Sequence, residues 1–152
     1  MKRQNVVVLM LACASALGLA ACETIEEEVA QVAGARFHAN LSGANEVPAG
    51  DPDGMGGAHL VINDTLNRIC TDLEVRNIGP VTAAHIHRGA AGVNGPPVVT
   101  LDAPDDDDSD DCDTVEDALV DEIVRNPSGF YVNVHTADYP AGAIRGQLMR
   151  MP

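Results

Sequence analysis

The chain has few basic and few aromatic side chains. Of its 152 residues, 9 are Lys or Arg and 23 are Asp or Glu, and Lys2 is the only lysine, so the formal net charge is −14. A nucleic-acid backbone requires clustered Lys and Arg, so this balance argues against nucleic-acid binding. Trp is absent, and Phe37, Phe130, Tyr131 and Tyr139 alone provide no evident platform for stacking sugars. The length allows one modest domain.

Motifs of nucleophilic catalysis are also missing. Beyond residue 21 the serines are Ser42, Ser109 and Ser128, and none stands in a Gly-x-Ser-x-Gly elbow. The Gly-rich segment 89–97 leads into a strand pattern, so it has no helix N-terminus to hold a phosphate. Acidic residues are so numerous that pairs of carboxylates are expected by chance, so no pair can be assigned a catalytic role from the sequence. We therefore expect a protein that is not an enzyme.

The N-terminal segment predicts export. Lys2 and Arg3 precede the apolar residues 6–12 and the small residues 14–21, which is typical of a secretory signal peptide. Residues 19–22, Leu-Ala-Ala-Cys, resemble the bacterial lipobox, which implies that Cys22 carries lipid and anchors the chain without spanning the membrane. A plain signal peptide cut nearby is the alternative.

These features predict three segments and a location. The segments are a lipoprotein signal peptide (1–21), an acidic tether (22–35) and one domain (36–150). Glu23 after the cysteine favours the outer membrane, so we expect a lipid-anchored protein of the bacterial cell envelope, in the outer membrane or periplasm. Its envelope or extracellular partner is not indicated.

The cysteines predict one disulfide. Cys13 lies in the signal peptide and Cys22 takes the lipid, which leaves Cys70 and Cys112. In an oxidising compartment two remaining cysteines are expected to pair, although free thiols or a metal site remain alternatives. Because Cys70 has the solvent-facing parity of its segment, we expect the bridge to hold an outer loop.

The body of the chain alternates apolar and polar residues. Phe37, Ala39 and Leu41 share one parity, and His38 and Asn40 share the other. A period of two gives a strand one core face and one solvent face. About seven such segments predict an all-β fold, an antiparallel β-sandwich. The segments are 37–41, 59–63, 69–76, 82–87, 98–101, 129–136 and 143–149.

One segment predicts a helix, over about residues 115–125. Thr114 followed three residues later by Asp117 is typical of a helix start, and Pro127 ends the helix. Apolar residues at helical spacing predict a face that packs on the sandwich. That face consists of Val115, Leu119, Val120 and Ile123.

Several segments resemble the CHRD domain, which was first described in chordin and is common in bacterial exported proteins. They are 37–48, 84–89, 126–127, 131–136 and 139–148, and together they cover about residues 35–150. The resemblance implies an extracytoplasmic β-sandwich module of largely undefined role. Growth-factor-binding repeats of chordin are absent here, so that function is not carried over. The sequence departs from the family in seven Asp between Asp105 and Asp113, which we expect to form a loop before the helix.

Three histidines form the sharpest candidate site. His85 and His87 are two residues apart, so both project from one face of a strand. His135 shares a parity with Tyr131 and Asn133, and in one sheet all three histidines would converge on its solvent side. Imidazole suits copper and zinc, and three ligands leave a position open. Structural histidines bonded to the backbone are the alternative interpretation.

The His-x-His pair is also similar to the copper-binding strand of Cu/Zn superoxide dismutases. The other zinc ligands and the loop of that family are not evident, so we expect no dismutase activity. His38 and His59 are single solvent-face candidates and receive no role.

The acidic run is a second candidate, for Ca²⁺. It lacks the Gly and the terminal Glu of an EF-hand loop, so a solvated, self-repelling loop is the other interpretation. The candidate ligands are Asp105, Asp106, Asp107, Asp108, Asp110 and Asp111. The predicted function is a non-catalytic binding or structural module; the alternatives are a copper- or zinc-binding or redox protein and, more weakly, an adhesion module that requires divalent cations.

Overall fold

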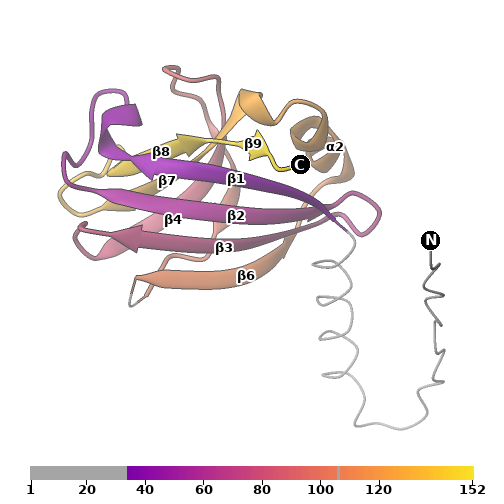
Figure 1. Cartoon of the computed structure of the whole chain (residues 1–152), viewed down its shortest axis with the longest axis horizontal. Coiled ribbons are helices and arrows are strands. Elements are labelled where there is room, and N and C mark those ends of the chain that lie inside the picture. The colour runs from indigo at the N-terminus through magenta and orange to yellow at the C-terminus, as the bar shows by residue number, and fades with distance from the viewer. Residues whose placement is uncertain (1–33, 106) are drawn as a thin grey trace, which may run out of the picture.

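The computed structural model describes residues 34–105 and 107–152 (Figure 1). The predicted signal peptide, the lipid site Cys22, most of the tether and Asp106 lie outside these residues. The elements in chain order are β1 (Ala35–Ser42), η1 (Gly43–Asn45), β2 (Met55–Asn63), β3 (Arg68–Arg76), β4 (Val81–Arg88), β5 (Pro97–Leu101), β6 (Asp108–Thr114), α2 (Asp117–Arg125), η2 (Pro127–Gly129), β7 (Phe130–Thr136), β8 (Ile144–Gln147) and β9 (Met149–Arg150).

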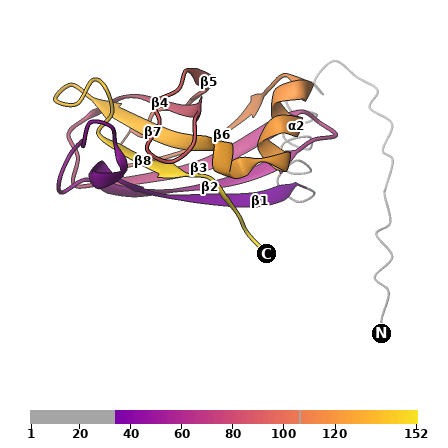
Figure 2. The same ribbon diagram turned by 90° about the horizontal axis from the view of Figure 1, so that it is seen from above.

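The strands form one nine-stranded antiparallel sheet that folds over on itself. Its order is β5-β4-β7-β8-β1-β2-β3-β6, and β9 pairs with β1. The sheet turns where β8 meets β1 at Ser42 and Arg145, so two layers face each other and the shape approaches a barrel (Figure 2). The all-β antiparallel prediction is confirmed. The described residues contain two strands beyond the seven expected, and these are β6 and β9.

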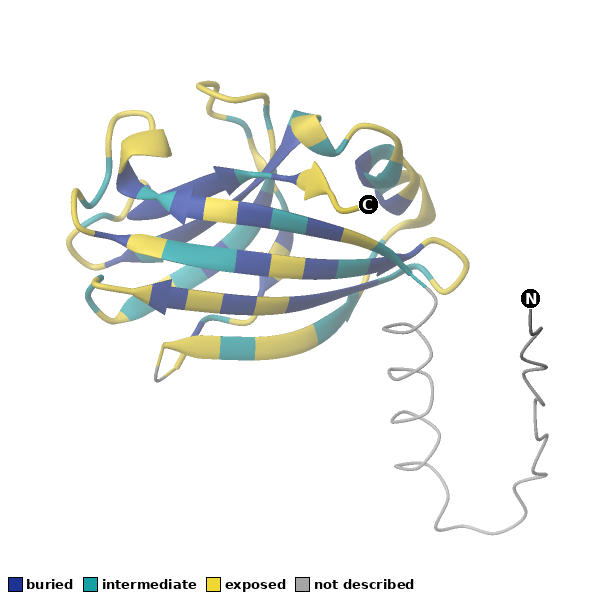
Figure 3. Ribbon diagram, viewed as in Figure 1, coloured by how far each residue is buried: buried dark blue, intermediate teal, exposed yellow. Residues whose placement is uncertain are grey.

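The core lies between the two layers and follows the period of two. Along β1, Phe37, Ala39 and Leu41 are buried, and the banding of β1, β2 and β3 shows the alternation directly (Figure 3). In β7, Val132 and Val134 are both 0% exposed. These two side chains therefore face the core, as expected, and the alternate residues of the strand, His135 among them, face outward. At about 25 cal/mol per Å², burial of such side chains is the main stabilising contribution of the fold.

The predicted helix is present and covers one end of the sandwich. Helix α2 begins at Asp117 rather than at 115, because Thr114 is the last residue of β6 and Glu116 occupies the N-cap position. Val120 and Ile123 are buried against the core. None of the helices in the described part of the chain is long and apolar enough to cross a membrane.

The expectation of a loop for the whole acidic run is wrong. Residues 108–114 form β6, which pairs with β3 from Arg68–Thr114 to Glu74–Asp108. Asp is a poor strand former, but here backbone pairing with β3 overrides that preference. β6 is an edge strand, and a row of charges on an edge discourages pairing with another chain.

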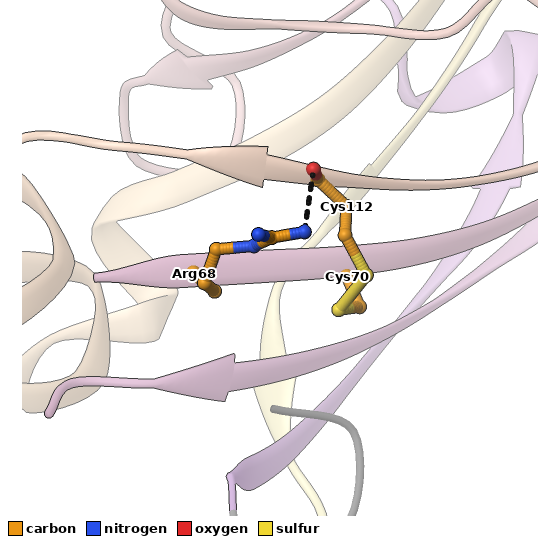
Figure 4. Close-up of a disulfide and its surroundings, with 3 residues drawn as sticks. All are labelled: Arg68, Cys70 and Cys112. Carbon is orange, nitrogen blue, oxygen red and sulfur yellow. Dashed lines mark hydrogen bonds between the residues drawn. A yellow bond between two sulfur atoms is a disulfide. The ribbon is translucent and has the colours of Figure 1, made fainter. Parts of the chain in front are cut away.

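The Cys70–Cys112 disulfide joins these two strands (Figure 4). The two cysteines lie directly opposite each other in the β3–β6 register. Arg68 Nη2 donates a hydrogen bond of 3.3 Å to the Cys112 carbonyl oxygen beside the bridge. The bridge therefore fixes the acidic edge strand to the sheet, instead of holding an outer loop.

Candidate metal centre

Strands β4 and β7 bring the three predicted histidines to one face. In their register His85 lies opposite Asn133, His87 opposite Tyr131, and His135 opposite Ala83. The intervening side chains of both strands point into the core. The imidazoles therefore lie on the outer face of the β5-β4-β7-β8 layer, where alternation predicted them.

The three imidazoles form a group that could hold a metal ion. One ligand atom from each of His85, His87 and His135 can be chosen so that all three lie within 4.8 Å of one another. The ring centroid of His85 lies 5.5 Å from that of His87 and 5.1 Å from that of His135. Zn–N bonds are about 2.0–2.1 Å long, so the ligand nitrogens of a tetrahedral zinc site lie about 3.3 Å apart. Side-chain rotations would have to bring the three atoms closer for one ion to bind all of them.

Backbone carbonyls orient two of the rings. His87 Nδ1 lies 2.8 Å from the Gly95 carbonyl oxygen, and His135 Nδ1 lies 3.1 Å from that of Pro140. A carbonyl only accepts hydrogen bonds, so each Nδ1 carries a proton, and in the neutral ring Nε2 is then the nitrogen with the free lone pair. Histidines that bind metals usually donate the N–H of their other ring nitrogen to a carbonyl or carboxylate in this way, which holds the ring in place.

Three of the four remaining ring nitrogens of the cluster have no partner among the described residues. His85 Nδ1, His87 Nε2 and His135 Nε2 are buried and make no hydrogen bond in the described part of the chain. A buried polar atom without a partner requires an explanation. The structural-histidine interpretation accounts for the two carbonyl contacts, but it does not account for three unpaired nitrogens gathered on one face.

The surroundings lower the pKa of two of the three histidines. Burial lowers the pKa of His85, and the neighbouring His135 and His87 lower it further. Burial also lowers the pKa of His87; the hydrogen bond to Gly95 opposes this shift, whereas His135 and Arg145 add to it. At neutral pH these two rings are therefore neutral, which is the form that binds a metal ion.

Tyr131 supports His87 in two ways that sequence reasoning missed. Its ring stacks on the His87 ring at a centroid distance of 4.9 Å. Its hydroxyl accepts a hydrogen bond of 3.2 Å from the backbone N–H of Gly95, the residue whose carbonyl holds His87. The shared parity of Tyr131 and His135 could have revealed the stacking, but no signal in the sequence indicated the role of Gly95.

A buried ionic network lies beside Tyr131. Asn133 donates a hydrogen bond to Glu46, and Arg145 Nε lies 3.8 Å from the other Glu46 oxygen. Burial raises the pKa of Glu46, and Arg145 opposes this rise. Arg145 Cζ also lies 4.5 Å from the centroid of the Tyr131 ring. At Gly142, where φ is +143°, an added Cβ would collide with the Glu46 carboxylate, so the site requires glycine.

The other predicted site residues are not brought together in this way. In β6, Asp108 and Asp110 alternate with Ser109 and Asp111, so the side chains divide between the two faces of the strand. The Ca²⁺ site stays a prediction, and its member Asp106 lies outside the described residues. His38 and His59 lie opposite each other on the outer face of the other layer.

Comparison with known families gives one match. The family model described as CHRD domain matches residues 37–148, a span that contains all three histidines of the candidate centre. A match to this family supports a binding or structural module in general. Comparisons with curated proteins and with solved structures found no match.

Proposed function

The chain belongs to the CHRD domain family, and from this premise we propose that its domain is a non-catalytic binding module that holds a copper or zinc ion at His85, His87 and His135. The observation that carries the proposal is the gathering of three unpaired imidazole nitrogens, each buried, on one rigid sheet face. Neutral imidazoles are common ligands of both metals. Three ligands leave a fourth position for water or for a group from a partner.

The proposed location is the cell envelope, with the lipid on Cys22 as anchor. The lipobox-like residues 19–22 and the Cys70–Cys112 disulfide, which fits an oxidising compartment, support this part of the proposal. The tether would hold the domain away from the membrane surface.

Metal titration tests the proposed function. Purified protein is titrated with Zn(II) or Cu(II) against a competing chelator, together with a His85→Ala/His87→Ala variant. Thr82→Ala, an exposed change on the same strand, is the matched control. We expect the cluster of the double variant to bind at least 100-fold more weakly, because His135 is then its only imidazole, and Thr82→Ala to bind as the original chain does.

The metal assignment is wrong if the original chain binds neither metal more tightly than the double variant does. Thermal unfolding without metal accompanies the titration. It shows whether the double variant is folded, so a loss of binding can be assigned to the ligands.

A further inference from the structure

A second set of side chains that can bind metals lies on the opposite face of the molecule. His38 in β1 lies directly opposite His59 in β2 and, on its other side, directly opposite Met149 in β9. Opposite residues in an antiparallel sheet project from the same face. The three side chains therefore form a transverse row on the outer face of the β1-β2-β3-β6 layer, away from the first cluster and separated from it by the core.

The strand register places the three side chains side by side across this face. Directly opposite residues have Cβ atoms about 4.5–5.5 Å apart, so a central imidazole can be joined from both sides by its neighbours. His38 is half-buried, whereas His59 and Met149 are exposed and can turn toward it. Among the described residues, only the first cluster brings three His, Cys, Asp or Glu within metal range. A third ligand at this row would therefore have to be of another type, and Met149 offers a thioether.

His38 provides an independent indication that a ligand is missing. Its Nδ1 is buried and makes no hydrogen bond with any described residue. A bound ion near this ring would resolve that deficit. Asp72 in β3 lies opposite His59 and provides a carboxylate that can orient the His59 ring from behind.

We propose that His38, His59 and Met149 form a second metal site, which takes copper in its reduced form, Cu(I). A thioether is a soft ligand and selects Cu(I), while imidazole accepts copper in either oxidation state. Zn(II) gains little from the methionine sulfur, so the preference for Cu(I) over Zn(II) should be stronger here than at the three-histidine cluster. The proposal does not depend on the first site, because no residue is shared.

Stoichiometric loading with Cu(I) tests this site. The chain is titrated anaerobically with Cu(I) against a chromophoric chelator, and a His38→Ala/His59→Ala variant and the His85→Ala/His87→Ala variant are titrated alongside. We expect two equivalents for the original chain and one for each double variant. Asn40→Ala, two residues along β1 on the same exposed face, is the matched control and should keep both equivalents.

A methionine variant tests the third ligand. Met149→Leu should weaken one equivalent at least tenfold and remove the Cu–S signal from the X-ray absorption spectrum of the His85→Ala/His87→Ala variant. Met55→Leu, an exposed methionine at the far end of β2, should change neither.

The outcomes separate the two sites. Loss of every equivalent in the His85→Ala/His87→Ala variant, or two equivalents kept by His38→Ala/His59→Ala, would overturn the second site. If the original chain binds a single equivalent in all, and that equivalent disappears with His38 and His59 but survives loss of His85 and His87, the second site is supported and the first is contradicted.

Discussion

Arg145 is the side chain whose removal tests the energetics of the fold most sharply. It is 3% exposed, and its Nε donates a hydrogen bond of 2.8 Å to the Asn45 carbonyl oxygen. Its Nη1 lies 3.0 Å from Asn94 Oδ1, and its charge faces the buried carboxylate of Glu46. The change Arg145→Met keeps most of the aliphatic stem and removes the charge together with these hydrogen bonds.

The expected cost follows from the Glu46 carboxylate. Removing one partner of a buried ion pair leaves the other charge uncompensated and costs about 3–5 kcal/mol of unfolding free energy. That is a large fraction of the roughly 5–15 kcal/mol by which a domain is stable. In Glu46→Gln/Arg145→Met both charges are absent, so we expect this double variant to be more stable than Arg145→Met alone.

Urea unfolding at pH 7 and pH 4 measures the effect. The pKa of Glu46 is raised above its ordinary value of 4.5 in the folded protein, and loss of Arg145 raises it further. A carboxyl with a raised pKa contributes stability that is present below its unfolded pKa and is lost as the pH rises through its folded pKa. The deficit of Arg145→Met should therefore shrink at pH 4, where Glu46 is protonated. A deficit below about 1 kcal/mol at pH 7, or one that stays constant between the two pH values, would refute the reasoning.

Two further changes give simple outcomes. Tyr131→Phe removes the hydroxyl that holds Gly95, the residue whose carbonyl orients His87. In a chelator competition it should weaken metal binding at the three-histidine cluster about tenfold, the lower end of the effect expected when a group that orients a metal ligand is lost. Tyr139→Phe should leave the affinity unchanged in the same assay. Asp113→Asn should raise the thermal midpoint at pH 7, because burial, with a contribution from Asp111, raises the pKa of Asp113 and makes its charged form unfavourable. The gain should vanish below pH 3.8, the ordinary carboxyl value, where both states are protonated; the same gain at acid pH would contradict this explanation.

The period of two was sufficient to predict the strands that carry the candidate site. Side-chain direction alternates along any strand, so apolar Val132 and Val134 fixed which face of β7 carries His135. The same rule placed His85 and His87 together. Whether β4 and β7 are neighbours could not be derived from local pattern, and it is this pairing that brings His135 to the other two histidines.

The features that were not predicted depend on contacts between distant segments. The acidic residues of β6 have low strand preference, and they form a strand because β3 offers a backbone edge and Cys70 holds Cys112. Likewise, Gly95 orients His87 through a carbonyl, and every residue has a carbonyl, so its identity carried no signal.

The buried network joins three of the segments that resemble the CHRD domain. Glu46 comes from the first of these segments, whereas Asn133 and Arg145 come from the last two. A buried ion pair often stabilises a fold no more than a well-packed apolar cluster would, so stability alone is a weak reason for its presence. Position is a stronger one: Arg145 contacts the loop at Val93 and Asn94 and stacks on Tyr131, which in turn stacks on His87. We infer that the network fixes the loop over β4 and β7 and so determines the direction of the His87 ring in the proposed metal centre. A directional, charged contact specifies geometry where apolar packing would tolerate several arrangements.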